Sequence, residues 1–515
     1  MRGTSQQRLL NYRIVGAWLL FVAIASWFGV GWIQADEHSR VLEAAHKVAY
    51  GFASLPWEFD DRNPIVSMLI GVIFSPLLMI TRFYGASGLT EAFILRFVFG
   101  LIASTRLLAL MRCFHKTGLR QDRTWIYLLI SCFTVYGPLF FCRTSQENLA
   151  ATTLLWAYAI HFDVIDPAAS RESRGLDTFL FGALLALTAT FRPQAGVAAA
   201  GLGLYALWKR GPGVIPLSAA GLFAGLLPGA LVDTYYTGIP FRPAWNYLVY
   251  ALGNEDGGQV WGVSPWWWYI PQYFDSWYPP VSVLAVVPVA IALWNVPSLA
   301  VTILPFTIVH CVLGHKETRY FVPMIGFMHL ATFAGFEAME RLWPQTLSRF
   351  GSTFYRPARY YLLCLVALTL ATCFLPLNSS PWMYDRLRQG ISSGRISRYT
   401  QLADSMSGVM QFYVKQGERV PGPLGNLKAA TRLVSSGREY VQGWVAGQDM
   451  DVSLYRPIAA ACRVDYVSLP EFVRSIFERI EKSPARKKLN MIFYCESPFT
   501  IPAQENPSDA KKARS

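Results

Sequence analysis

The stretch VLGHKETRYFVPM (residues 312–324) places four ionisable side chains between two apolar segments. His315, Lys316, Glu317 and Arg319 fall within five positions. Removing such groups from water is costly, and charged residues inside a membrane are rare and usually functional. The stretch therefore predicts a chain of membrane-spanning helices in which charged groups gather, for a purpose, at a helix end.

The composition agrees with this interpretation. Of 515 residues, 53% are hydrophobic and only 15% are charged, whereas a soluble domain carries about a quarter charged residues. The net charge of +13 suits basic cytoplasmic loops beside anionic lipid. No basic stripe with interleaved aromatic residues occurs, so we expect the bilayer as a partner and no nucleic acid.

Eleven apolar runs are long enough to cross a bilayer. They are 14–34, 92–111, 124–141, 147–164, 175–191, 194–208, 213–232, 281–295, 297–313, 320–337 and 358–376. The first run follows a basic N-terminus and could imitate a signal peptide. No small-residue cleavage site precedes the acidic sequence ADE, so we expect an uncleaved spanning helix.

A further run, NPIVSMLIGVIFSPLLMITRF (63–83), decides the orientation of every later segment. The basic N-terminus and the basic loops 112–123, 209–210 and 340–359 lie on one face only if this run does not invert the chain. We therefore predict that it is a re-entrant or interfacial segment, helped by Pro64 and Pro76.

The opposite, outer face then receives most of the unusual polar residues. It holds the first outer loop (35–91), a long loop (233–280) and the polar tail 377–515. Polar residues gathered on one face are typical of an enzyme at a membrane surface, whereas a conduction pathway scatters them through the spans. We expect a transmembrane domain over 1–376 and a small mixed domain over 377–515, in which Cys462 and Cys495 could pair in an oxidising compartment.

Two carboxylates follow the first span directly, in GWIQADEHSRVLEAAHKVAYG (31–51). Asp36 and Glu37 are placed at the membrane rim, where a partly desolvated carboxylate can act as a general base for a sugar hydroxyl. Downstream, Trp57 and Glu58 are candidates for a groove that binds the acceptor, the molecule that carries this hydroxyl. Asp60 and Asp61 are interpreted as ordinary acidic loop residues.

Arginines occur at the outer ends of two other helices, Arg143 in CRTSQENLA and Arg192 in TFRPQAG. A lone arginine at such a place is commonly explained by snorkelling. Two arginines together with His315, Lys316 and Arg319 on the same face would form a cationic site that grips a phosphate.

The long outer loop is rich in tryptophan and tyrosine. The simplest interpretation is an aromatic belt at the membrane interface. Aromatic faces also stack on sugar rings, so Asn246, Trp266, Trp267 and Tyr269 are further candidates for the acceptor groove.

Several signatures of other enzyme classes are missing from the sequence. There is no GxxxxGK(S/T) loop, no GxGxxG after a strand, no HExxH, no GxSxG and no CxxC pair. We therefore expect no metal, no cofactor and no soluble nucleotide-binding domain. A transferase would need a sugar donor other than a nucleotide sugar bound to a Rossmann fold, and a lipid-linked phosphosugar lying in the bilayer would suit the cationic site.

The order of these motifs resembles glycosyltransferase family 22. DE after the first span, followed by LE..H..A.G...LPWEF, is similar to the family pattern PDE…E..H…G…TWEW, and CRTSQENLA and FRPQAG are similar to xRTxSNxxE and RPTAA. DTYYTGIPFRPAWNYLVYALG, WGVSPWWWYIPQ and HKETRYFVPM resemble three further family motifs, with Trp267 where histidine is usual and Tyr320 where phenylalanine is usual.

The resemblance implies an all-α polytopic C-type glycosyltransferase fold with about eleven transmembrane helices. Family members use lipid-phosphate mannose in N-glycan precursor and GPI-anchor assembly. The implied reaction is inverting transfer from a polyprenyl- or dolichyl-phosphate mannose to a glycolipid acceptor, giving an α-mannoside. Asp36 would be the base, and Glu317 would orient the neighbouring cations.

Other interpretations remain open at this stage. The chain could transfer another lipid-linked sugar, transport a lipid or glycan without reaction, or act as a scaffold whose tail 377–515 binds a partner. For an enzyme, the expected location is the endoplasmic reticulum membrane in a eukaryote, or the inner membrane with a periplasmic active site in a bacterium.

Overall fold

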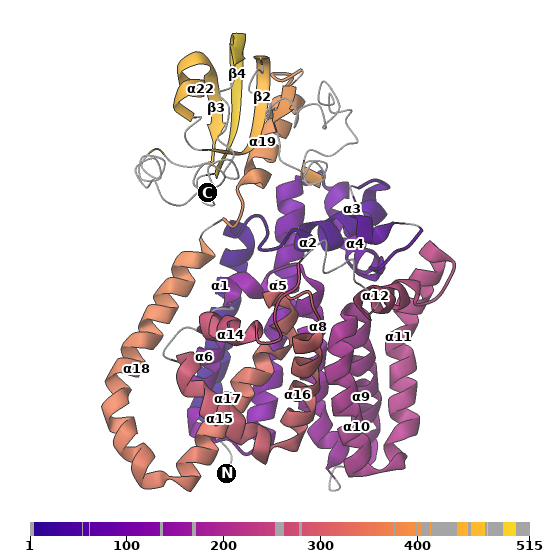
Figure 1. Cartoon of the computed structure of the whole chain (residues 1–515), viewed down its shortest axis with the longest axis vertical. Helices are drawn as coiled ribbons and strands as arrows, with labels where there is room; N and C mark the ends of the chain where they lie inside the picture. The colour runs from indigo at the N-terminus through magenta and orange to yellow at the C-terminus, as the bar shows by residue number, and fades with distance from the viewer. Residues whose placement is uncertain are drawn as a thin grey trace. The chain divides into compact units, whose positions relative to one another are not determined.

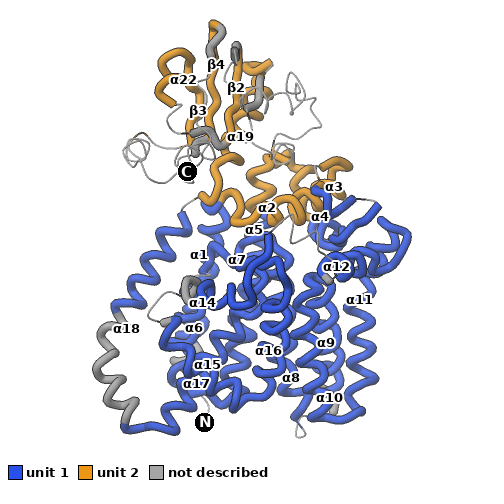
Figure 2. Tube along the Cα trace, viewed as in Figure 1, with its two compact units in different colours: residues 1–29, 56–74, 94–375 blue, residues 30–55, 75–93, 376–515 orange. Residues whose placement is uncertain are grey.

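A computed structural model describes most of the chain, and it is mainly helical (Figure 1). The described residues are 5–53, 55–60, 62–133, 137–166, 171–252, 262–277, 281–374, 376–397, 399–402, 412–413, 440–451, 455–468, 471 and 488–500. Two compact units are distinguished in Figure 2. Unit 1 comprises residues 1–29, 56–74 and 94–375, and unit 2 comprises residues 30–55, 75–93 and 376–515.

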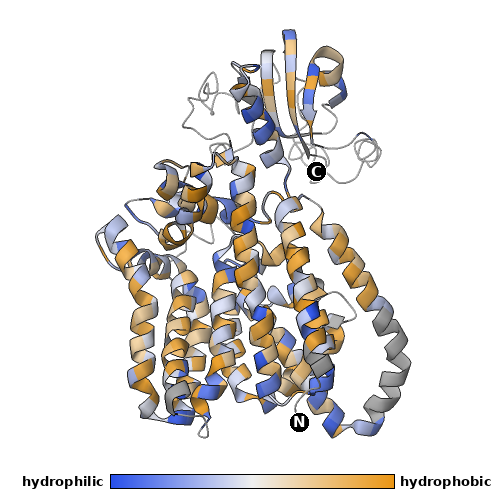
Figure 3. Ribbon diagram, turned by 180° about the vertical axis from the view of Figure 1, so that it is seen from behind, coloured by the Kyte–Doolittle hydropathy of each residue, from blue (hydrophilic) through white to orange (hydrophobic). Residues whose placement is uncertain are grey.

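Unit 1 is built from helices with long apolar surfaces (Figure 3). Its α-helices are α1 (Ser5–Phe28), α5 (Gly88–Lys116, which starts in unit 2), α6 (Thr124–Phe133), α7 (Pro138–Phe141), α8 (Gln146–Ile165), α9 (Arg171–Phe191), α10 (Gly196–Arg210), α11 (Ile215–Thr237), α12 (Arg242–Leu252), α14 (Tyr269–Trp277), α15 (Val281–Asn295), α16 (Pro297–Val312), α17 (Ile325–Leu342) and α18 (Pro344–Cys373). Short 3-10 helices are η2 (Trp57–Phe59), η3 (Gln121–Arg123), η4 (Pro193–Ala195), η5 (Pro212–Val214) and η6 (Thr318–Met324).

Within the described residues, five helices are long and apolar enough to cross a membrane, or six if the bent pair α15 and α16 forms one span. The expected polytopic fold is therefore confirmed, while the finer prediction of eleven spans stays a prediction. The bend between α15 and α16 is 116°. Because this bend exceeds a right angle, α16 runs back toward the side from which α15 came. The start of α15 and the end of α16 therefore point to the same side.

Close packing of α9 against α11 depends on small residues. A Cβ atom at Gly221 would lie 2.0 Å from the carbonyl oxygen of Phe179, and one at Gly225 would lie 2.4 Å from that of Ala183. Membrane helices have no hydrophobic driving force for association, so such close contact supplies much of the attraction between them.

The segment with the predicted re-entrant or interfacial position forms α4 (Leu69–Phe83), which includes Pro76. A helix of this length spans roughly 22 Å, less than the hydrocarbon core of about 30 Å. The length suits the prediction, which stays a prediction.

Unit 2 contains a small sheet and the helices of the first outer loop. The strands β1 (Tyr399–Leu402), β2 (Tyr440–Asp451), β3 (Arg463–Val467) and β4 (Lys488–Thr500) lie in the order β1-β2-β4-β3. β1 is parallel to β2, and β4 is antiparallel to both of its neighbours. The helices are α2 (Ala35–Glu37), the π-helix η1 (His38–Leu42), α3 (Glu43–Tyr50), α19 (Ser380–Ser392) and α22 (Tyr455–Ala461).

The sheet limits the expected all-α class to the membrane part of the chain. Apolar and aromatic runs of the tail, such as MIFYC (491–495), form strands because β-branched and aromatic residues fit a half-buried sheet. Cys462 and Cys495, the two cysteines that could pair, are joined by a disulfide between the start of β3 and β4.

Candidate functional site

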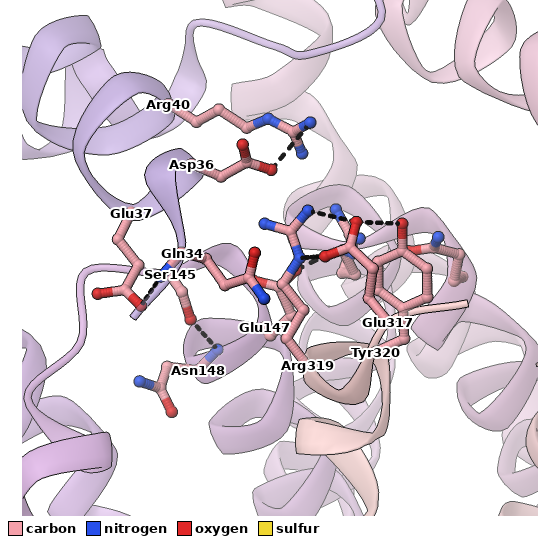
Figure 4. Close-up of polar contacts among 12 residues, drawn as sticks. Gln34, Asp36, Glu37, Arg40, Ser145, Glu147, Asn148, Glu317, Arg319 and Tyr320 are labelled. Atoms are coloured by element: carbon pink, nitrogen blue, oxygen red, sulfur yellow. Dashed lines mark hydrogen bonds and ion pairs between the residues drawn. The ribbon is translucent and has the colours of Figure 1, made fainter. Parts of the chain in front are cut away.

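The segment that follows α16 is organised around the carboxylate of Glu317 in unit 1. This carboxylate accepts hydrogen bonds from Arg319 Nη2 at 2.9 Å and the Tyr320 hydroxyl at 3.1 Å (Figure 4). It also accepts one from His315 Nε2 at 3.1 Å. Burial acts to raise the pKa of Glu317, but Arg319 and these hydrogen bonds outweigh it and lower the pKa below its ordinary value. The contacts are those that an orienting residue needs, and the role itself stays a prediction.

Glu147, in the first turn of α8, joins three of the motifs. Its Oε1 lies 3.3 Å from Arg192 Nη2 and 3.9 Å from Arg319 Nε. The Arg192 guanidinium also lies over the ring of Tyr320, at 5.0 Å. Burial is the strongest single influence and would lower the pKa of Arg192, but Glu147 together with Tyr247 and Tyr320 outweighs it and raises the pKa. The structure thus brings the predicted residues Arg192, Arg319 and Glu317 together.

Lys316, the neighbour of Glu317 in the same segment, is buried. Its ammonium donates to the carbonyl oxygens of Ser264, at 3.2 Å, and Leu313. Burial lowers the pKa of Lys316. The Tyr269 hydroxyl is 3.3 Å from the Glu317 carbonyl oxygen, so the loop before α14 lies against the segment after α16.

Arg143 is buried just after α7, where it contacts the backbone of α7 and of the residue that follows α1. Its Nη2 donates to the carbonyl oxygen of Gly29 at 2.8 Å, and its Nε donates to that of Leu139 at 3.0 Å. These bonds tie the C-terminal end of α1 to α7. A role for Arg143 at the donor phosphate stays a prediction.

The candidates for an acceptor groove differ in exposure. Trp57, Trp266 and Trp267 expose about half of their surface or more, at 50%, 68% and 49%. Glu58 is buried, and Asn246 Nδ2 donates to the Pro64 carbonyl oxygen at 2.8 Å. The exposed rings of these three tryptophans are accessible for stacking on sugar rings.

The two carboxylates after the first span belong to unit 2, and their surroundings differ (Figure 4). Asp36 Oδ2 lies 3.0 Å from Arg40 Nη2, one helical turn on, and its side chain is 23% exposed. Glu37 is buried, and its Oε1 accepts the backbone N–H groups of Ile33 and Gln34, both at 3.1 Å. Asp61, interpreted as an ordinary loop residue, lies outside the described residues.

An apolar cavity of about 520 Å³ opens beside the segment after α16. It is lined by residues of α14, α15, α16, η6 and α17, among them Tyr269, Leu293, Cys311, Thr318 and Phe321. Tyr269 and Thr318 also border the polar cluster, so the cavity and the cations adjoin. Among the residues that the structure describes, no group of three or more His, Cys, Asp or Glu side chains could hold a metal ion.

Two buried residues of unit 1 make contacts that the sequence interpretation did not predict. Glu147 stood within a quoted motif, but nothing local marked it as the partner of Arg192 and Arg319. Arg106 is buried within α5, where its Nη2 donates to Asn148 Oδ1 at 3.0 Å and its guanidinium lies 4.0 Å from the centre of the Phe141 ring. A charged residue inside an apolar run was the signal that could have revealed Arg106.

Comparisons with known proteins agree on the type of chain. The sequence model of a protein family, described as the Alg9-like mannosyltransferase family, matches residues 17–403 of this chain. The chain is 23% identical over 305 residues to GPI alpha-1,2-mannosyltransferase 3 of Bos taurus (57% of this chain, 53% of that protein). It is 24% identical over 359 residues to alpha-1,2-mannosyltransferase alg9 of Schizosaccharomyces pombe (65% and 60%). The chain thus spans about half the length of the first of these relatives.

Two solved structures with a similar fold were determined with a lipid phosphate bound. ArnT from Cupriavidus metallidurans, bound to undecaprenyl phosphate, aligns with a TM-score of 0.56 at 12% identity, covering 93% of this chain and 97% of that one. The archaeal oligosaccharyltransferase AglB from Archaeoglobus fulgidus, in complex with an inhibitory peptide and a dolichol-phosphate, aligns with a TM-score of 0.51 at 10% identity (89% and 71%). At such identities the likeness shows the fold alone.

Proposed function

Because the chain belongs to the Alg9-like mannosyltransferase family, as the resemblance predicted, we propose that it moves mannose from a polyprenyl- or dolichyl-phosphate mannose donor to a membrane glycolipid. The transfer inverts the anomeric centre and forms an α-mannoside. The relatives include both GPI mannosyltransferases and an alg9 protein, so the acceptor is named only by its class.

The observation that carries this proposal is the cationic segment beside an apolar cavity. In the described part of the chain, the hydrogen-bond acceptors of Lys316 are carbonyl oxygens, so no carboxylate there matches its charge. An ammonium has three N–H donors, which leaves one for an anion. A lipid-linked phosphosugar has an anionic phosphate next to a long apolar chain, and the cavity lined by Thr318 and Phe321 fits that chain. The lipid phosphates bound to ArnT and AglB support the same donor class.

The proposed reaction is a single displacement. Asp36 takes the proton from the acceptor hydroxyl while that oxygen attacks the anomeric carbon on the face opposite the phosphate. The bond from this carbon to the phosphate oxygen breaks, and the lipid phosphate leaves with the electron pair. Lys316 and Arg319, with Arg192, His315 and Arg143 as further candidates, stabilise the negative charge of the leaving group.

We further propose an active site on the outer face of an eleven-span membrane domain, with residues 377–515 on the same side. The disulfide between Cys462 and Cys495 supports this orientation, because disulfides persist in oxidising compartments. The compartment would be the endoplasmic reticulum lumen in a eukaryote or the periplasm in a bacterium.

A transfer assay with the purified full-length chain tests the proposal. Labelled polyprenyl-phosphate mannose and a crude glycolipid acceptor pool are supplied, and labelled glycolipid is measured. Loss of a general base should slow Asp36→Asn by about 100-fold or more. Asp60→Asn is the matched control, since Asp60 is an exposed carboxylate of the same loop, and it should act within about twofold of the parent. No transfer by the parent, or equal transfer by Asp36→Asn, would disprove the mechanism.

A further inference from the structure

Two aromatic residues of the tail lie in the core of the first outer loop, within unit 2. Phe412 and Tyr413 are 0% and 1% exposed, respectively. The residues they contact belong to the part of the chain that carries Asp36. The tail therefore contributes directly to the packing of this loop.

The contacts centre on two buried histidines. Tyr413 stacks on the ring of His38 at 5.7 Å with an interplanar angle of 21°, and Phe412 meets the same ring edge-on at 5.3 Å. Phe412 also lies 5.2 Å from the ring of His46. A third contact holds His38, because its Nε2 is 3.0 Å from Glu43 Oε1. The imidazole of His38 is thus fixed on several sides.

The backbone of the two aromatic residues also approaches the first residue of α5 very closely. A Cβ atom at Gly88 would lie 2.8 Å from Tyr413 Cα and 2.9 Å from the Phe412 carbonyl oxygen. Real Cβ contacts are longer, so any side chain at Gly88 would push Phe412 and Tyr413 away from their place. Phe412 and Tyr413 are therefore held both by their backbone against Gly88 and by their rings against His38.

His38 is connected to Asp36 by a short helical run. Asp36 lies in α2, and η1 begins at His38 without a break. Arg40, within η1, forms the ion pair with Asp36 at 3.0 Å. A shift of His38 would therefore move both the backbone that carries Asp36 and the arginine that orients its carboxylate.

We propose that Phe412 and Tyr413 are positioning residues for the catalytic carboxylate, acting through His38. This rests on the proposed function of Asp36 as the base. Through these two residues, the tail then contributes to the kcat of the transferase. Since a misplacement of about 1 Å can cost about 100-fold in rate, loss of the two rings should act on kcat more than on the KM of the donor.

The test uses the full-length chain and compares Phe412→Ala and Tyr413→Ala with Phe493→Ala. Phe493 is the matched control, because it is also a phenylalanine with 0% exposure but lies in β4 of the sheet. We expect the first two variants to lose about 10- to 100-fold in kcat with a donor KM within about twofold of the parent, and Phe412→Leu and Tyr413→Phe to restore most of the rate. Phe493→Ala, compared per folded protein, should keep its kcat. Equal loss in all three alanine variants would overturn the proposal.

Amide hydrogen exchange over residues 35–50 gives a second readout that needs no activity. Phe412→Ala and Gly88→Ala should both speed exchange there, whereas Phe493→Ala and Asp36→Asn should not. Unchanged exchange in Phe412→Ala would overturn the proposal, even if the parent transferred no sugar. A parent without transfer whose exchange responds as expected would instead count against Asp36 as the base and leave the positioning contact established.

Discussion

The buried ion pair between Arg192 and Glu147 offers the sharpest test of the site's electrostatics. Its charged atoms are 3.3 Å apart, and the two side chains are 6% and 4% exposed. With an effective dielectric constant of about 20, unit charges at this distance attract by about 5 kcal/mol. Desolvation of both ions offsets much of that attraction, but removing Glu147 leaves the buried charge of Arg192 without this counter-charge and costs about 3–5 kcal/mol. Removing Arg192 costs less, because Arg319 Nε remains 3.9 Å from the same Glu147 oxygen.

A double-mutant cycle measures the coupling. Glu147→Gln should lower the free energy of unfolding by about 3 kcal/mol or more, and Arg192→Gln should lower it by less, because Arg319 still faces Glu147. The double variant should be less destabilised than the sum of the two by about 1–3 kcal/mol, because it leaves neither charge alone. The assay is reversible unfolding of the full-length chain in mixed micelles, followed by tryptophan fluorescence.

The pair between Arg123 and Glu340 is the control. Its charged atoms are only 2.6 Å apart, but the side chains are 33% and 37% exposed. Exposed pairs contribute about 0–1 kcal/mol, so its cycle should give the smaller coupling despite the shorter distance. If both cycles gave the same coupling, burial would not govern the strength of these pairs, and the reasoning for Arg192 and Glu147 would be refuted.

Three further predictions follow from single features. Because the folded pKa of Glu317 is lowered from its usual value of 4.5, the stability that it gives is complete above that pH and is lost as the pH falls through the folded pKa. The drop in Tm from about pH 5.5 to about pH 3.5 should thus be larger for the parent than for Glu317→Gln. Equal drops in the two proteins would contradict this contribution of Glu317 to stability. Replacing Cys462 and Cys495 by serine should destabilise the sheet by about 2–4 kcal/mol, seen as faster proteolysis of residues 440–500, and unchanged proteolysis would argue against the disulfide. Thr307→Trp, which fills the apolar cavity, should raise the donor KM about tenfold (about 1.4 kcal/mol) and leave the acceptor KM unchanged, whereas an unchanged donor KM would exclude the cavity as the lipid site.

The helices of unit 1 were predictable because local signals determine them. The run 297–313 corresponds to α16, Pro297–Val312, with a proline in its first turn and charged residues just beyond its end. The run 147–164 corresponds to α8, whose N-cap Ser145 accepts the N–H of Asn148. Apolar length and end signals are properties of neighbouring residues, so no tertiary information was needed.

The contacts that build the site were not predictable in the same way. Glu147 pairs with residues from two distant segments, and an acidic residue in a first helical turn is also expected simply from the helix dipole. The position of Phe412 and Tyr413 against His38 joins parts of the chain separated by the whole membrane domain. Neither pairing leaves a periodic pattern, because both depend on how the helices are arranged in space.

Asp36 is the base that the family resemblance predicts, with Glu37 beside it, and the contacts of the two carboxylates differ. Glu37 is the third residue after the N-cap Gln34, and its carboxylate reaches back to two backbone N–H groups, the arrangement of a capping box. A base in that position would give up those bonds to take a proton, so the proposed proton transfer falls to Asp36. Glu37→Gln keeps an oxygen that can accept the backbone bonds and should retain transfer within about threefold, while Glu37→Ala should destabilise the loop by about 1 kcal/mol. Transfer rates and Tm of both variants decide the matter: if Glu37→Gln were as slow as Asp36→Asn, Glu37 would share the chemistry.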